Sequence, residues 1–220
     1  MRSIISFIFL LACTSPVKAI NVGSITTFID SADDNVSKEI ENNSEQARLV
    51  TVSIERISSP EEGGITIPME MDGELLLSPS RLLLPAKAKN NVRFFYKGLE
   101  DDIERYYRIT WRDTSLSVDE QRNGRRQAMA TTSAQIGTIL VVSPRKSSFN
   151  YTLKHSVLTN LGNTSYRVIA YGVCLDDRSK QCKETYYDLP GKARTFQRVD
   201  VTHKESHIGL WLGQDFVVVK

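Results

Sequence analysis

The most specific chemical signal in the sequence is a pair of cysteines. Cys174 and Cys182 are separated by seven residues that include the turn-like run Asp176-Asp177-Arg178-Ser179. In an exported protein this pair predicts a disulfide that closes a small loop, because an oxidising compartment leaves few free thiols. Two cysteines are too few for a structural zinc site, which takes four ligands.

The histidines and the clustered acids do not form a catalytic or metal-binding pattern. His203 and His207 are four residues apart, but the polar run between them is typical of a hairpin tip and not of a helix. No nucleophile motif accompanies His155, and the chain has neither a Gly-x-Ser-x-Gly elbow nor a phosphate-binding glycine loop. The acidic cluster lacks the glycine and glutamate of a calcium loop and predicts a turn: Asp30, Asp33 and Asp34. We expect a protein that is not an enzyme and that uses no cofactor and no metal.

The first 19 residues predict export. Met1-Arg2 gives a positive start, and Ile4 to Cys13 is an apolar run of about ten residues, shorter than the roughly 20 that a membrane span needs. Val17-Lys18-Ala19 fits a signal-peptidase site, so the mature chain is expected to begin at Ile20. Lipidation at Cys13 is the alternative, and the residues that follow this cysteine disfavour it.

The charge balance argues against nucleic acid as the main partner. Loss of Arg2 and Lys18 with the signal peptide lowers the 28 basic side chains to 26, equal to the 26 acidic ones. Counterion-driven binding to nucleic acid needs a strong basic excess, which a near-neutral chain lacks.

Short β-rich runs separated by turn signals recur from Ile20 onward, and helical periodicity is absent. In the stretch Leu49 to Ile57, apolar Leu49, Val50, Val52 and Ile54 are set against Thr51, Ser53 and Glu55, as a half-buried strand requires. The expected strands are 25–29, 36–40, 49–57, 74–77, 81–84, 92–96, 106–111, 128–142, 150–153, 157–159, 166–174, 185–189, 194–199, 208–212 and 216–219. This pattern predicts an all-β protein built from sandwiches.

Two features divide the chain. The polar stretch Asp113 to Gln127 has almost no large apolar residues and predicts a loop, which the long strand Ala128 to Val142 follows. Pro144 with Lys146-Ser147-Ser148 then marks a linker. We therefore expect a signal peptide over 1–19, a first domain over 20–143 and a second over 144–220.

Several patches, in order and with suitable spacing, resemble one known family. They are Leu76-Leu77-Ser78-Pro79-Ser80-Arg81-Leu82-Leu83-Leu84-Pro85-Ala86, Val92-Arg93-Phe94, Glu104-Arg105-Tyr106-Tyr107-Arg108-Ile109-Thr110-Trp111 and Ser143-Pro144-Arg145. The chain resembles the periplasmic chaperones of chaperone-usher pilus assembly, and most closely the alternate-branch chaperone of the enterobacterial common pilus.

The resemblance implies two immunoglobulin-like domains in an L-shaped (boomerang) arrangement. It also implies a periplasmic chaperone that completes pilus subunits, the major pilin and the tip adhesin, by donor-strand complementation. Such a chaperone delivers its subunits to the outer-membrane usher. A free chaperone with an exposed strand edge could also cap itself as a homodimer. The alternative is a secreted two-domain adhesin or surface-binding module with the same fold.

The site residues are expectations drawn from the resemblance, and two departures stand out. The last strand of the first domain would donate Met129, Thr131, Ser133, Ile136 and Ile139, of which several are smaller than is usual in the family. Where the family grips the subunit's terminal carboxylate with two basic residues, this chain carries Thr26 and Ile139.

Other residues must then supply the carboxylate anchor and the interdomain contact. The candidates for the anchor are Arg108, Arg93 and Arg112, with Arg108 preferred because it interrupts an aromatic strand. A solvated or structurally paired arginine is the alternative for each. Glu104 and Arg145 are expected to form an ion pair at the domain corner, or to be two unrelated surface charges.

Overall fold

The computed structural model describes residues 19–115 and 133–220, so all of the predicted signal peptide except Ala19 lies outside the described residues. These two segments contain sixteen strands and no helix. Accordingly, the described part of the chain holds no helix that is long and apolar enough to span a membrane. The expectation of an all-β protein is confirmed.

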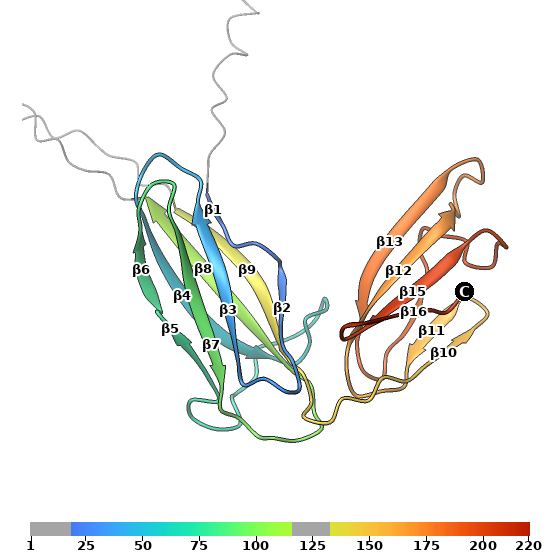
Figure 1. The fold of residues 1–220 in the computed structure, drawn as a ribbon, viewed down its shortest axis with the longest axis horizontal. Helices are drawn as coiled ribbons and strands as arrows, with labels where there is room; N and C mark the ends of the chain where they lie inside the picture. Colours follow the sequence, from blue (N-terminus) through green and yellow to red (C-terminus); the bar gives the residue numbers. More distant parts are fainter. Residues whose placement is uncertain (1–18, 116–132) are drawn as a thin grey trace, which may run out of the picture.

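Nine strands form a first sandwich of two sheets (Figure 1). The four-stranded sheet has the order β1-β3-β7-β5, with bounds Ile20–Asn21, Asn35–Asn42, Lys89–Tyr96 and Leu75–Ser78. The five-stranded sheet has the order β2-β9-β8-β4-β6, with bounds Thr26–Ile29, Ser133–Val142, Arg105–Ser115, Arg48–Ile57 and Arg81–Leu84.

The alternation in the sequence explains which side chains fill the space between these sheets. In β4 the side chains of Val50 and Val52 are buried, whereas Thr51 and Ser53 face solvent. In β8 every second residue is buried, and Trp111 packs edge-on against Phe94 of the opposite sheet with 6.2 Å between ring centroids. The period of two residues therefore places one continuous apolar core between the two sheets.

Seven further strands form a second, smaller sandwich (Figure 1). One sheet has the order β10-β11-β14, with bounds Tyr151–Lys154, Val157–Asn160 and Ala193–Thr195. The other has the order β13-β12-β15-β16, with bounds Gln181–Asp188, Tyr166–Val173, His207–Leu212 and Asp215–Val218. A separate core fills it, which includes Leu158, Val168 and Leu210. The chain thus has the two sandwiches of unequal size that its sequence predicts.

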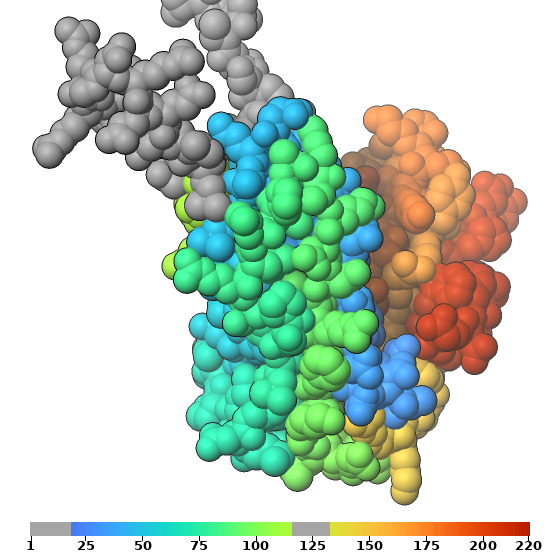
Figure 2. Space-filling model, turned by 60° about the vertical axis from the view of Figure 1, so that its left-hand side comes forward, coloured from blue at the N-terminus to red at the C-terminus, as the bar shows by residue number. Residues whose placement is uncertain are grey.

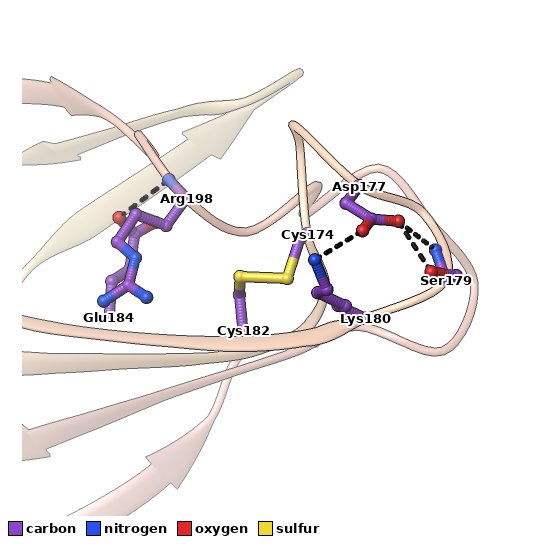
Figure 3. The surroundings of a disulfide bond; sticks show 7 residues. All are labelled: Cys174, Asp177, Ser179, Lys180, Cys182, Glu184 and Arg198. Carbon is purple, nitrogen blue, oxygen red and sulfur yellow. Dashed lines mark hydrogen bonds and ion pairs between the residues drawn. A yellow bond between two sulfur atoms is a disulfide. The ribbon is translucent and has the colours of Figure 1, made fainter.

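The predicted disulfide is confirmed. Cys174 and Cys182 are bonded, with 5.0 Å between their Cα atoms, at the end of the β12–β13 hairpin (Figure 3). Within the closed loop, Lys180 lies 2.7 Å from the carboxylate of Asp177, which also accepts a bond from the Ser179 hydroxyl. The disulfide between Cys174 and Cys182 therefore closes a small exposed loop at the tip of the second sandwich.

The two sandwiches meet at one end of the molecule and diverge from that corner (Figure 1). In Figure 2 the blue segment after β2 lies beside the yellow linker and the red β15–β16 hairpin, and residues 30–32 line one pocket with Gly213 and Gln214 of its turn. The backbone nitrogen and the hydroxyl of Ser165 both donate to the buried carboxylate of Glu104, so that an acid of the first sandwich binds the second directly.

The ion pair expected between Glu104 and Arg145 is not formed in the described structure. The carboxylate of Glu104 accepts hydrogen bonds from the backbone nitrogen and the hydroxyl of Ser165. It accepts a third from the hydroxyl of Tyr106, at 2.6 Å. Arg145 instead donates to the backbone carbonyl oxygen of Asp33 at 2.6 Å and lies over the ring of Tyr96. Both residues lie near the corner, but a carboxylate that already accepts three hydrogen bonds does not need a cation to be satisfied.

Candidate functional site

Half of strand β9 has an open edge. On one side β9 pairs with β8 along its whole length, from Ser133 to Val142. On the other side β2 pairs with it only from Ile139 onward, in parallel. Within the described residues, no strand covers the remaining half, Ser133 to Thr138, on that side.

The direction of the backbone groups on this edge follows from the ladder. Ile139 and Ser143 donate their N–H groups toward the β2 side, to Ile25 and Ile29 at 2.8 and 2.9 Å. Because residues two apart in a strand point the same way, the N–H and C=O groups of Ser133, Gln135 and Gly137 also point to that side. As far as residues 19–115 and 133–220 show, three residues therefore present unpaired backbone groups in a row, which is a template for one more strand.

The edge is open because the first strand changes sheets. β1 pairs with β3 in the four-stranded sheet, and after Gly23 the chain crosses to the five-stranded sheet and continues as β2. Gly23 has a φ of 66°, a left-handed conformation that favours glycine. The crossing happens opposite Ser133 to Thr138, so the segment that would have closed the sandwich edge there leaves it uncovered.

Lys38 fixes this crossing, and the sequence analysis missed it. It lies on β3 with its side chain pointing inward, and its ammonium donates to the backbone oxygen of Ser24 and, at 3.0 Å, to the hydroxyl of Thr27. Burial lowers the pKa of this lysine. A signal was available, because Lys38 stands between Val36 and Ile40 on the apolar side of an alternating strand.

The donor residues expected on β9 do not all share one face. Ile139 and Ser133 are on the outer face with Gln135 and Gly137, whereas Ile136 packs against the core of the first sandwich. Residues three apart in a strand point to opposite faces, so Ile136 cannot act together with Ile139 in one groove. Met129 and Thr131 lie outside the described residues.

The three arginines expected as anchors are not brought together. Arg108 and Arg112 are both on the outer face of β8, and Arg108 lies next to Ile139 and 4.0 Å from the carboxylate of Glu55. Arg93 is exposed on β7 in the other sheet, which the core separates from the open edge. Thr26 and Ile139 are register partners in the parallel pairing of β2 with β9.

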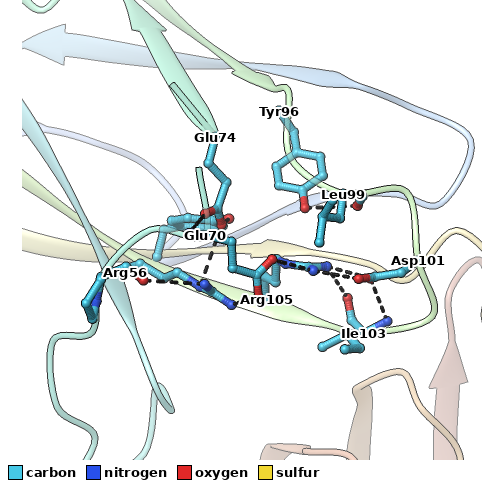
Figure 4. Close-up of polar contacts among 10 residues, drawn as sticks. Arg56, Glu70, Glu74, Tyr96, Leu99, Asp101, Ile103 and Arg105 are labelled. Atoms are coloured by element: carbon cyan, nitrogen blue, oxygen red, sulfur yellow. Dashed lines mark hydrogen bonds and ion pairs between the residues drawn. The ribbon is translucent and has the colours of Figure 1, made fainter. Parts of the chain in front are cut away.

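A charge network holds the loop between β4 and β5 against the end of the first sandwich (Figure 4). The buried guanidinium of Arg105 donates to Asp101 at 2.6 Å and to Glu70 at 2.7 Å, and these bonds lower the pKa of both carboxyls. Arg56 of β4 binds the same Glu70 at 2.6 Å. The network bonds the end of the loop at Glu70 to Arg105 of β8. The other end of the loop contacts the second sandwich, where Arg194 donates to Glu61.

Comparison with known proteins gives consistent relatives over the whole chain. A family model described as the EcpB C-terminal domain matches residues 149–219. The chain is 49% identical over 212 residues to a protein of Klebsiella pneumoniae subsp. pneumoniae called "Probable fimbrial chaperone EcpB", and the match covers 96% of each chain. It is 47% identical, with the same coverage, to a protein of that name from Escherichia coli O157:H7.

Solved structures of low sequence identity share the fold. A class 5 fimbriae chaperone, CfaA, superposes with a TM-score of 0.54 at 14% identity, covering 90% of this chain and 97% of the other. The Escherichia coli chaperone DraB superposes with a TM-score of 0.52 at 13% identity, covering 93% and 97%. At such identities the likeness extends to the fold alone.

Proposed function

Because the chain belongs to the EcpB family of fimbrial chaperones, we propose that it holds a fimbrial subunit by pairing its open β9 edge with a strand of that subunit. The subunit so held is called the client below. The observation that carries the proposal is the row of backbone groups at Ser133, Gln135 and Gly137, which no other described strand pairs because the first strand crosses to the β2 position.

The physical reason is that strand addition needs no bond chemistry. A sandwich that lacks a strand exposes unpaired backbone groups and apolar surface, and each is costly in isolation. An edge such as that of β9 supplies the missing ladder, and main-chain hydrogen bonds tolerate clients of different sequence. The outer face of β9 adds polar Gln135, Gly137 without a side chain, and apolar Ile139, which together offer little apolar bulk and suit shallow client pockets.

The finer parts of the proposal are supported by the resemblance to pilus chaperones and by the sequence patterns. The protein works in the periplasm after loss of residues 1–19, with a first domain over 20–143 and a second over 144–220. It serves the major pilin and the tip adhesin, passes them to an outer-membrane usher, and caps its own edge as a homodimer when free. No enzymatic step is part of this role. A self-complete adhesin is not favoured, because an adhesin has no use for a spare strand edge.

The test is site-specific cross-linking during co-expression with a fimbrial subunit encoded beside the chaperone. A photo-reactive residue at Gln135, which is exposed on the open edge, should capture the subunit. The same residue at Arg93, exposed on the other sheet, is the matched control and should not. Capture from Arg93 and none from Gln135 would move the client to the opposite face and refute the proposal.

A further inference from the structure

The open edge of β9 adjoins residues of the same chain that can cover part of it. The ladder between β2 and β9 stops at the bond of 2.8 Å from the N–H of Ile139 to the carbonyl oxygen of Ile25. With the same offset, the next step would pair Ser24 with Gly137. The N–H of Gly137 would then donate to Gly23, and its carbonyl oxygen would accept a bond from Ile25. A Cβ at Gly137 would have no other atom of the described residues within 4 Å, so the place is unoccupied.

Burial of apolar surface favours this step. The side chain of Ile25 is 68% exposed although it is apolar. The alternation in β2, where Ile29 points inward, would turn Ile25 to the same side once it joined the strand. Its partner on β9 would be Thr138, which is buried and accepts a bond from the indole of Trp111. The extended strand would therefore bury a side chain that the crossing leaves in water, so another contact must favour the crossing.

Lys38 supplies that contact. Its ammonium donates to the carbonyl oxygen of Ser24, within the crossing, and at 3.0 Å to the hydroxyl of Thr27, within β2. The residue is 7% exposed, and no carboxylate of the described residues forms an ion pair with it. A buried ammonium without an acid depends on each neutral acceptor that it has, because losing one leaves the charge poorly solvated.

The bond from Lys38 to Ser24 is incompatible with the extended strand. Lys38 belongs to β3 in the opposite sheet, so the carbonyl group of Ser24 is now bonded across the sandwich. In a strand that group would lie in the plane of the five-stranded sheet, as carbonyl groups of a ladder do. Pairing with β9 would therefore take away one of the two acceptors of the ammonium.

The other bonds of the crossing lie at the surface. The N–H of Gly23 donates to the side chain of Asn21 at 2.9 Å, and the hydroxyl of Ser24 donates to the carbonyl oxygen of Thr26 at 2.8 Å. Both bonds are exposed, and water can replace either partner with little loss. The bond from buried Lys38 is therefore the one that opposes extension most strongly.

We propose that Lys38 is a positioning residue that keeps the client site open, and that residues 23–25 are the chain's own competitor for the edge at Gly137. The proposal rests on the proposed function, because the site is the one that the client strand would use. The competitor reaches Gly137 and not Gln135, because the preceding residue, Val22, is 6% exposed and anchored in the core.

The experiment measures amide hydrogen exchange in the free chaperone, diluted until it is monomeric. The test variant is Lys38→Met, because methionine is about as long as lysine, carries no charge and is well tolerated in cores. Lys38→Gln is the second variant, which decides the test if Lys38→Met does not fold. The matched control is Asn21→Ala with Ser24→Ala, which removes the two exposed side-chain bonds of the crossing and keeps Lys38.

In Lys38→Met the amide of Gly137 should exchange about tenfold more slowly than in wild type, whereas Gln135 should stay fast. Adding Ile25→Asn, which places a polar side chain where extension would bury it, should restore fast exchange at Gly137. The control should exchange as wild type does. A merely structural role of Lys38 would speed exchange in this region and not slow it. Unchanged or faster exchange at Gly137 in the folded Lys38 variant, or protection in the control, would overturn the inference.

Client binding gives an independent readout. The affinity of the neighbouring fimbrial subunit for Lys38→Met should be about fivefold lower than for wild type, because the client must displace residues 23–25 from Gly137. An unchanged affinity would overturn the inference and leave strand addition standing. If wild type does not bind the subunit at all, the proposed function fails, and the role of Lys38 in client binding fails with it.

Discussion

Glu104 and Ser165 join the two sandwiches through one hydrogen-bonded acid. The carboxylate of Glu104 accepts a bond of 2.7 Å from the backbone nitrogen of Ser165 and a second from its hydroxyl, and burial raises the pKa of this carboxyl. Tyr106 donates to the same carboxylate at 2.6 Å. The corner is therefore held by directional bonds between buried groups, which define one angle between the sandwiches.

Replacing Glu104 with alanine should loosen this corner. Ser165 and Tyr106 would lose an acceptor in a buried place, which typically costs about 1–3 kcal/mol of folding free energy. We expect a lower unfolding temperature and a broader distribution of interdomain distances in small-angle X-ray scattering. Glu100→Ala, at an exposed position nearby, is the control, and equal scattering from both variants would argue against a role of Glu104 in setting the angle.

Asp188 should make the second sandwich more stable in mild acid than at neutral pH. It is fully buried, its carboxylate accepts one hydrogen bond from a described residue, Tyr166, at 3.2 Å, and burial raises its pKa to about 6 from 3.8. The folded state thus binds the proton more tightly than the unfolded chain does. Its free energy of unfolding should fall as the pH rises from about 4 to 6 and stay low above that.

The variant Asp188→Asn should remove that dependence. At pH 7.5 it should be more stable than wild type by about 1–3 kcal/mol, and near pH 4 the two should be equal, as chemical denaturation at several pH values will show. Asp177→Asn is the control of opposite sign, because hydrogen bonds from Lys180 and Ser179 lower the pKa of Asp177. A destabilised Asp188→Asn at pH 7.5 would contradict the account.

Loss of the disulfide should weaken the second sandwich without affecting the client site. Changing Cys174 and Cys182 to serine frees a short loop, which by chain entropy costs about 2 kcal/mol. The thermal unfolding temperature should fall, and binding of the fimbrial subunit at 25 °C should be unchanged because the loop is far from β9 in the fold (Figure 1). Loss of binding by the folded variant would implicate this loop in client recognition.

Proline substitutions can distinguish the backbone N–H groups of β9 that point to the open edge from those that bond to β8. Gln135→Pro removes an N–H that points to the open edge, so the β8–β9 ladder should survive and proline is tolerated on such an edge. The affinity for the client should fall roughly five- to tenfold, because one backbone hydrogen bond to the added strand is lost and the proline ring packs less well against that strand. Ala134→Pro is the matched variant, because its N–H points toward β8, and it should lower the unfolding temperature instead. A Gln135→Pro variant that binds its client normally would speak against pairing at this edge.

The alternation of apolar and polar residues was enough to predict most strands, because a sandwich buries one face of each. The strand Arg81–Leu84 is predicted at its observed bounds, and β4 differs by one residue. The prediction fails where strand pairing, and not the sequence pattern, decides. β1 has only two residues, and β14 ends at Thr195 although the predicted strand extends to Val199. Such short elements exist only because a neighbouring strand bonds them.

The site was less predictable, since it depends on register and on contacts distant in sequence. The outward direction of Gln135 and Gly137, and the inward direction of Ile136, follow only once the pairing with β8 is known. The contact of Glu61 with Arg194 joins residues 133 positions apart on different sandwiches. The inward contacts of Lys38, in contrast, could have been predicted, because a lysine at an inward position of an alternating strand needs a buried hydrogen-bond acceptor.

Residue-resolved amide hydrogen exchange of β9, in the free chaperone and in its complex with a fimbrial subunit, tests the central claim most directly. In the free protein, diluted until it is monomeric so that no second copy caps the edge, the amides of Gln135 and Gly137 should exchange fast, and those of Ile136 and Thr138, bonded toward β8, slowly. Binding should protect Gln135 and Gly137 by tenfold or more and leave Ile136 and Thr138 nearly unchanged. Unchanged exchange at Gln135 and Gly137 in a saturated complex would contradict strand addition at this edge.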